Sequence, residues 1–359
     1  MFRRMLLSVL LLGLSAPILP AQTTPSPALL ALAKRDRTLA IIDPTTLKIV
    51  AKIPCGPDPH EVIASSDGKL AFVSNYGGGA WHTISVIDLV AQKPLTEIDL
   101  TPLSGAHGLA FAGGKLYFTA EVNKVIGRYD PATQKVDWIL GTGQNRTHMV
   151  YVTPDLDHIY TSNVSSGTIS LIEKTMLAQG GPPPGGPGGP PPMPNGGSGP
   201  PPPPPGPPRP DWNETVLPAG HGSEGFDVSP DGRELWAASA GDGTITVIDI
   251  PGKKVAETLQ ADVRGANRLK FTLDGKLVFV SSLFGGEVTV IDTATRKVVK
   301  RIKVGRGAAG ILMDPNGQRA FVAASPDNSI AVIDLKTLAI TGHIEPGTEP
   351  DGMAWAVRQ

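Results

Sequence analysis

The sequence predicts an all-β protein, a seven-bladed β-propeller built from four-stranded antiparallel blades. Three observations carry this prediction: a strand-like segment ending in an acid recurs, its spacing is nearly constant, and no residues remain for a second domain. The segment 244–249 is typical, and the copies end at Asp43, Asp88, Asp130, Glu173, Asp249, Asp292 and Asp334. Neighbouring copies lie 42 to 45 residues apart except for one interval of 76, and about 40–45 residues is the length of one propeller blade.

Each repeat divides into four strands, as residues 265–304 illustrate. An alternating strand over 267–272 leads into an Asp274-Gly275 hairpin turn. A continuous apolar strand over 277–281 follows, then a third strand over 287–291 and an alternating outer strand over 297–304. Four antiparallel strands of this kind make one blade.

The two ends of the chain complement each other. Residues 28–53 supply the second to fourth strands of a blade that has no first strand, and residues 350–357 supply a first strand with nothing after it. We therefore predict that the C-terminal strand joins the N-terminal blade and closes the ring, so that no sheet edge stays open.

The long interval contains an insert, residues 179–211, made almost entirely of proline and glycine. Such a segment cannot bury enough apolar surface to fold, which predicts disorder or local polyproline II. It falls between the third and fourth strands of the fourth blade. The insert could contact a partner or the cell wall, or be a tolerated expansion without a function.

The N-terminus resembles a secretory signal peptide over residues 1–21. Arg3 and Arg4 precede an apolar run, 5–14, that is too short to span a bilayer, and the small residue Ala21 fits a cleavage site. We expect residues 22–359 to form one secreted propeller, periplasmic or at the cell surface, with no transmembrane span after cleavage. We also expect a monomer.

Composition narrows the classes of partner. The net charge of −1 gives no reason to expect a nucleic acid. The single cysteine, Cys55, excludes an internal disulfide framework and a Cys-x-x-Cys-His haem attachment. The repeated strand-end aspartates are interpreted as turn residues, because aspartate bonds its own backbone where a strand ends.

One register of the repeat gathers the residues that could carry chemistry. Seven residues before each Asp-Gly position, three successive blades have a histidine and the others have mostly carboxylate or amide side chains. In chain order these residues are His60, His107, His148, Glu224, Asn267, Ala309 and, in the closing strand, Asp351. The first strand of a blade lies innermost, so these side chains should ring one mouth of the central channel. With His221 nearby, they form the predicted ligand site, and Glu61, Asn75, Glu121 and Asn163 are candidate supporting residues.

Two chemistries and one structural role are open for this register. His60, His107, His148 and Glu224 could bind a divalent metal, since zinc, copper and nickel accept imidazole and carboxylate ligands. They could instead supply a general base. Alternatively, histidines repeated from one template could only bond blade backbone. The sequence indicates no other cofactor.

Several motifs resemble the YVTN family of β-propeller repeats. They are Ser229-Pro230-Asp231-Gly232, the strand ends 72–75 and 160–163, and the Val-Ile-Asp ends of third strands. The resemblance covers the mature chain apart from the insert and implies a relation to lactonase-like and quinoprotein amine dehydrogenase-like propellers. It implies the fold rather than an activity, because propellers have many unrelated functions.

We therefore expect a secreted binding module or scaffold that binds a protein or a small ligand at the channel mouth. The resemblance leaves two alternatives. One is a metal-dependent or lactonase-like hydrolase or lyase that uses the same residues. The other is an accessory subunit of a periplasmic redox system, whose partner would bring the cofactor.

Overall fold

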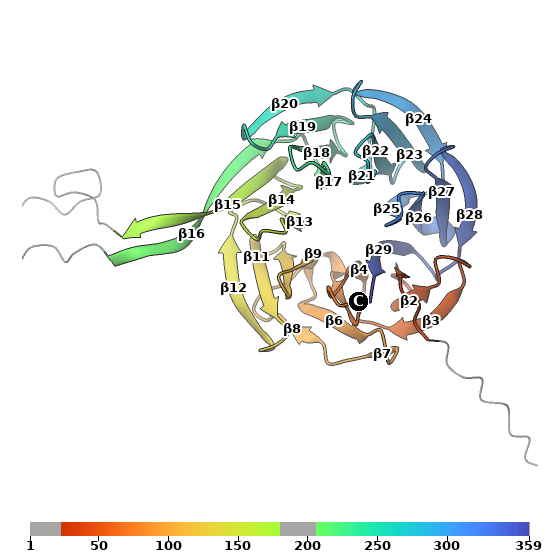
Figure 1. Ribbon diagram of the computed structural model, residues 1–359, viewed down its shortest axis with the longest axis horizontal. Helices are drawn as coiled ribbons and strands as arrows, with labels where there is room; N and C mark the ends of the chain where they lie inside the picture. The colour runs from red at the N-terminus through yellow and green to blue at the C-terminus, as the bar shows by residue number, and fades with distance from the viewer. Residues whose placement is uncertain (1–22, 180–205, 359) are drawn as a thin grey trace, which may run out of the picture.

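Seven antiparallel sheets stand around a common axis, as the prediction required (Figure 1). The computed structural model describes residues 23–179 and 206–358. Within these residues the only helices are two short 3₁₀ turns, η1 (Gly77–Gly79) and η2 (Ser325–Asp327), and no helix is long and apolar enough to cross a membrane. The predicted signal peptide lies outside the described residues.

The strands of a blade are numbered here from the axis outward. The innermost strands are β29 (Pro350–Ala356), β4 (Pro59–Ala64), β9 (Ala106–Ala112), β13 (Thr147–Val152), β17 (Ser223–Val228), β21 (Ala266–Phe271) and β25 (Ala308–Met313). The second strands are β1 (Ala28–Ala33), β5 (Leu70–Asn75), β10 (Lys115–Ala120), β14 (His158–Asn163), β18 (Glu234–Ser239), β22 (Leu277–Ser282) and β26 (Arg319–Ala324).

The third strands are β2 (Thr38–Ile42), β6 (Thr83–Asp88), β11 (Val125–Asp130), β15 (Thr168–Gln179), β19 (Ile245–Asp249), β23 (Glu287–Asp292) and β27 (Ser329–Asp334). The outer strands are β3 (Ile49–Pro54), β12 (Lys135–Gly141), β16 (Gly206–Pro218), β20 (Lys254–Leu259), β24 (Lys297–Lys303) and β28 (Ala339–Ile344). In the second blade the outer strand is split into β7 (Lys93–Pro94) and β8 (Ile98–Asp99).

The core lies between neighbouring blades and depends on one position of the second strand. The third residue of that strand is aromatic in every blade but the first, which has Leu30. The aromatic residues are Phe72, Tyr117, Tyr160, Trp236, Phe279 and Phe321, and all are buried. Burying one large apolar side chain stabilises a fold by about 1.5–3 kcal/mol, so this repeated position contributes strongly to holding the blades together.

The strand-end aspartates act as turn residues, as predicted. Asp43 Oδ1 accepts a hydrogen bond from the backbone N–H of Thr45 at 2.8 Å, and Asp334 Oδ1 accepts one from Thr337 at 2.7 Å. These bonds tie each carboxylate to the turn that starts the outer strand.

The predicted ring closure is confirmed. Strand β29 pairs antiparallel with β1, from Ala28 opposite Ala356 to Ala33 opposite Pro350. Trp355 also donates from Nε1 to the carbonyl oxygen of Met313 in the seventh blade at 2.8 Å. The C-terminal strand therefore joins the first blade to the last.

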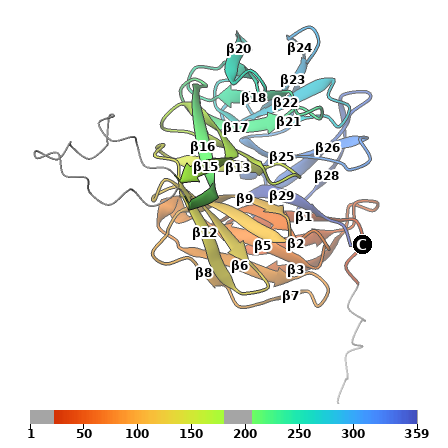
Figure 2. The same cartoon turned by 60° about the vertical axis from the view of Figure 1, so that its left-hand side comes forward.

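The structure differs from the prediction at both ends of the proline-rich insert. Gln179 and residues 206–211, predicted to be disordered, belong to β15 and β16, which continue as a paired hairpin beyond the ring (Figures 1 and 2). Prolines are tolerated there because β16 is an outer strand, whose free edge needs no N–H donors. Trp212 lies against Trp138, with ring centroids 5.4 Å apart, and fixes the base of the hairpin. Residues 180–205 lie outside the described residues.

Candidate functional site around the propeller axis

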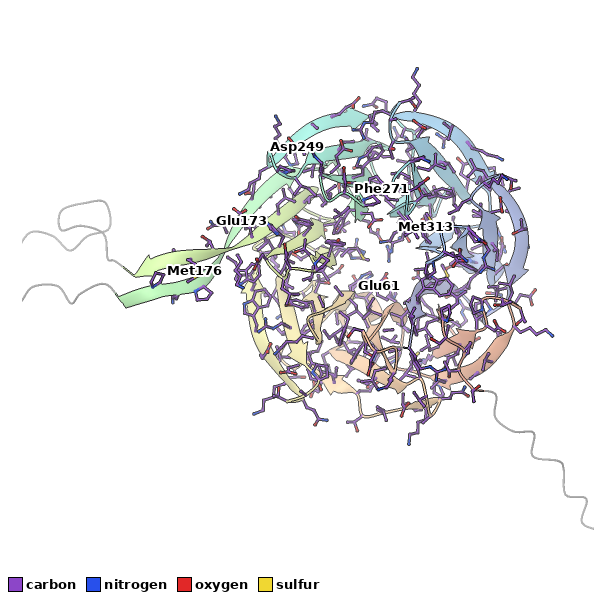
Figure 3. All side chains as sticks on the ribbon, in the orientation of Figure 1. Glu61, Glu173, Met176, Asp249, Phe271 and Met313 are labelled. Carbon is purple, nitrogen blue, oxygen red and sulfur yellow. The ribbon has the colours of Figure 1, made fainter. Side chains whose placement is uncertain are left out.

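The predicted register occupies one position in all seven blades. Each of its residues is the second residue of an innermost strand, from His60 in β4 to Asp351 in β29. Figure 3 shows Glu61, the next residue after His60, at the inner rim of the ring. The residues that share this register in the sequence therefore occupy equivalent positions around the propeller axis.

Backbone irregularity at this level sets the direction of the side chains. The pairing of each innermost strand with the second strand shifts here, for example between Pro59 and Val62 and between Ala266 and Leu269. Such bulges re-aim side chains. Two residues before the register position φ is positive in every blade, and four blades have glycine there. The other three have Asp58, Arg146 and Glu349, with φ of 49°, 57° and 57°, and such strain in non-glycine residues is concentrated at functional sites.

His148 is the centre of the site. It is 1% exposed and lies between two carboxylates: Nδ1 contacts Glu121 Oε1, and Nε2 lies 3.2 Å from Glu224 Oε1. Burial alone would lower the pKa of His148, but the charges of Glu224 and Glu121 outweigh burial and raise it. His148 is therefore stabilised as an imidazolium.

Arg268 extends this network across the axis. Its Nη1 donates to Glu224 Oε1 at 3.2 Å, and its Nη2 donates to Glu61 Oε1 from the second blade. Asn267 Nδ2 donates to the same Glu224 oxygen at 2.7 Å. Burial disfavours the charged form of Glu224, yet His148 and Arg268 lower its pKa to about 2. Glu224 is thus held ionised by three donors.

A cluster of aromatic rings lies beside the charged network. The rings of His107 and His148 have centroids 3.7 Å apart, and Tyr76 lies 4.9 Å from His107 and 5.0 Å from His60. Tyr76 donates its hydroxyl to Glu121 Oε2 at 2.5 Å, and burial together with this carboxylate raises the pKa of Tyr76 to about 12.

His107 differs from its neighbour His148 in its protonation. It is 2% exposed, and its Nδ1 is buried without a hydrogen-bond partner among the described residues. Burial, together with the positive charge of His148, lowers the pKa of His107 well below its usual value. The site therefore combines a neutral imidazole, His107, with the neighbouring imidazolium of His148, whose ring is tilted by 31° relative to it.

Two further ion pairs border this network. Lys34 Nζ lies 3.0 Å from Asp351 Oδ2, and Arg146 Nε lies 3.4 Å from Glu121 Oε2. Burial lowers the pKa of Lys34, but Asp351 outweighs this and raises it. The predicted residue Asp351 is thus paired with Lys34 rather than with the histidines.

The structure brings together most, but not all, of the predicted residues. His60, His107, His148, Glu224 and Asn267 form one cluster, and Glu121 and Glu61 join it as the predicted supporting residues. His221 is exposed in the loop before β17, and no interaction within the described ranges links its ring to the cluster. Asn75 and Asn163 do not support the cluster either, because they bond Thr83 and Thr168 at the start of their third strands.

Sequence reasoning missed Arg268, Tyr76, Arg146 and Lys34. A signal for Arg268 was present, because it follows Asn267 as Glu61 follows His60, and both stand at the bulge. Tyr76, Arg146 and Lys34 come from loops, whose contacts the repeat pattern does not encode.

The arrangement does not fit the predicted metal ligands. No group of three or more His, Cys, Asp or Glu residues in ranges 23–179 and 206–358 is placed to hold a metal ion. The physical reason is that both nitrogens of His148 already contact carboxylates and Glu224 is held by Arg268. A metal would have to displace these partners.

Comparisons with known proteins agree on the fold. A family model described as YNCE-like beta-propeller matches residues 216–319, which confirms the predicted relation to propeller repeats. No curated protein matches the sequence.

Solved structures of similar shape include a functionally unknown protein from Desulfotomaculum acetoxidans, at 13% identity and TM-score 0.69 over 93% of this chain and 100% of that chain. A putative 6-phosphogluconolactonase from Bacteroides uniformis has 13% identity and TM-score 0.70 over 92% and 99%. The hydrazine synthase of Kuenenia stuttgartiensis has 17% identity and TM-score 0.61 over 82% and 89%. At these identities the likeness concerns the fold alone.

Proposed function

We propose that the protein is an exported binding module whose small polar ligand binds at the network around the propeller axis. The network itself supports this proposal most directly. Buried ion pairs often contribute no more stability than apolar residues of the same size. The seventh blade has Ala309 and Gly310 where other blades have His60 and Glu61 or Asn267 and Arg268. A blade can therefore close the ring without charged groups at this level.

The network is also accessible from solvent. The side chains of Glu61, Glu224 and His60 are 13%, 17% and 19% exposed, while His107 and His148 are buried. Pre-formed polar groups that converge at one place are a general feature of small-molecule sites.

A thermal-shift and calorimetric screen of small polar metabolites tests the proposal. A true ligand should raise the melting temperature of the mature protein and bind His60→Ala at least tenfold more weakly, a loss of about 1.4 kcal/mol. The matched control is His343→Ala, since His343 is exposed on outer strand β28. Equal affinity for both variants would place the site elsewhere.

Export is tested separately, because the predicted signal lies outside the described residues. We expect the mature protein in the periplasmic or extracellular fraction with Gln22 as its first residue. A cytoplasmic protein that retains residues 1–21 would contradict this part of the proposal.

A hydrolase or lyase is the second candidate, favoured by the opposed protonation of His107 and His148. A pair of groups whose pKa values are pushed apart can supply a general base and a general acid. One of the similar structures is also described as a putative lactonase. Turnover of a lactone panel that is abolished in His107→Gln, with His148 still protonated by NMR, would support this candidate. Equal turnover in His107→Gln would exclude His107 as the base.

A further inference from the structure

Each basic side chain of the network described above is already paired. Arg268 contacts Glu61 and Glu224, His148 contacts Glu121 and Glu224, Lys34 contacts Asp351, and Arg146 contacts Glu121. An anionic ligand would therefore have to compete with a carboxylate of the protein for each positive charge. Such competition costs the ligand most of the charge attraction it would gain.

Unused hydrogen-bonding atoms near Arg268 are acceptors. Glu61 and Glu224 accept side-chain hydrogen bonds only at Oε1, and within the described chain no donor forms a hydrogen bond to Oε2 of either residue. Asn267 is 7% exposed, and its Oδ1 is buried with no partner among the same residues.

These three acceptors belong to one small region. Both carboxylates bind the same guanidinium of Arg268, and Asn267 bonds the Glu224 oxygen that Arg268 also contacts. The two carboxylate groups and the amide group that carry these acceptors are therefore joined in one hydrogen-bonded network around Arg268. A buried acceptor without a donor costs about 1–3 kcal/mol, which a ligand that donates a hydrogen bond would offset.

We infer that the ligand presents a primary ammonium group to Glu61, Glu224 and Asn267, and that phosphate and carboxylate compounds are excluded. This inference rests on the proposed function and specifies its ligand class. An ammonium has three N–H donors and no acceptor, so its donors match the three unused acceptor atoms. The positive charge also complements Glu61, whose only ion pair among the described residues is with Arg268. The inferred ligand therefore differs from a phosphorylated sugar lactone, the kind of substrate for which the similar 6-phosphogluconolactonase is named.

Three probes of equal chain length test the charge preference directly on the mature wild-type protein. They are 1,4-diaminobutane, 1,4-butanediol and succinate, and 6-phosphogluconate is added as the phosphate probe. Calorimetry in an amine-free buffer should show binding of the diamine at least tenfold tighter than of the diol, and none of the two anions, where tenfold is about 1.4 kcal/mol. Tighter binding of succinate or 6-phosphogluconate would overturn the inference but leave a ligand site at the axis.

Matched variants locate the diamine. Glu61→Gln should weaken diamine binding at least tenfold. Glu345→Gln should not, because Glu345 is exposed directly after outer strand β28 and no contact among the described residues links it to Arg268. If Glu61→Gln is unstable, chemical-shift changes of the Asn267 side-chain amide on adding diamine to the wild-type protein replace it. Failure of the diamine to bind, with a ligand from the metabolite screen bound in a His60-dependent way, would overturn the ammonium assignment alone. If the diamine does not bind and no metabolite binds in a His60-dependent way, the proposed ligand site at the axis is wrong.

Discussion

Glu224 is the residue on which the axial network depends most, and its replacement by glutamine gives the sharpest test of the electrostatic argument. Its Oε1 accepts from His148 at 3.2 Å, Asn267 at 2.7 Å and Arg268 at 3.2 Å. Glutamine preserves the shape but removes the charge that stabilises His148 and Arg268. The positive charges of His148 and Arg268 would stay buried with fewer negative charges beside them.

The expected loss can be estimated in two ways. A pKa of about 2 against the ordinary 4.5 corresponds to about 3 kcal/mol at neutral pH, since each unit is about 1.4 kcal/mol. Removing one partner of a buried ion pair typically costs about 3–5 kcal/mol. For a propeller of about 300 residues, the melting temperature falls by roughly 1.5 °C for each kcal/mol of lost stability. Glu224→Gln should therefore melt about 5 °C below the wild type.

The pH dependence has a definite sign. Because the pKa of folded Glu224 is depressed, its stabilisation is present above the unfolded value near 4.5 and is lost as pH falls toward about 2. Thermal unfolding of the two proteins at several pH values should show a gap that is constant near neutrality and narrows in acid. Glu345→Gln is the surface control. A Glu224→Gln protein that melts with this control, or a gap that widens in acid, would refute the reasoning.

Three other predictions concern the histidine pair and the ring. Because the pKa of His148 is raised, its stabilisation is present below about 6.5 and is lost as pH rises through the folded value, so the melting gap to His148→Gln should narrow as pH rises above about 6.5. Gly352→Ala should prevent folding or lower stability by several kcal/mol, since its Cβ would lie 2.3 Å from the carbonyl oxygen of His60, whereas Gly141→Ala meets nothing within 4 Å. Deleting residues 349–359 removes β29 and exposes the edge of buried β1. The melting temperature of the whole ring should fall, and an unchanged value would show that closure is dispensable.

The fold could be predicted because each of its determinants repeats. The strand-end acids, the Asp-Gly turns and the alternation of apolar residues report local backbone preferences, and seven copies leave little ambiguity. The closing strand could be predicted because residues 28–53 form a blade without its first strand, and residues 350–357 form a first strand without the rest of a blade.

The candidate site was predicted only where it follows the repeat. His60, His107, His148, Glu224 and Asn267 share a register, so their convergence could be inferred. Their protonation and partners could not, because these depend on the contact of Arg268 with Glu61 across 207 residues of sequence and on Tyr76 from a loop. The predicted metal site does not fit the structure for the same reason. The sequence shows which donor residues converge, but it does not show that the carboxylates are already paired with Arg268.

The assembly of the first blade from both chain ends has a consequence for the order of the polypeptide. Residues 28 and 356 are paired neighbours, so a short linker could join the termini without spanning the ring. A chain reopened within residues 180–205 would then begin with β16 and end with β15, and its ring would be closed in the fourth blade instead of the first. The fold of the propeller therefore does not depend on which blade contains the chain ends. Such a circular permutant should fold into the same seven sheets, with its new ends beside each other at the projecting hairpin.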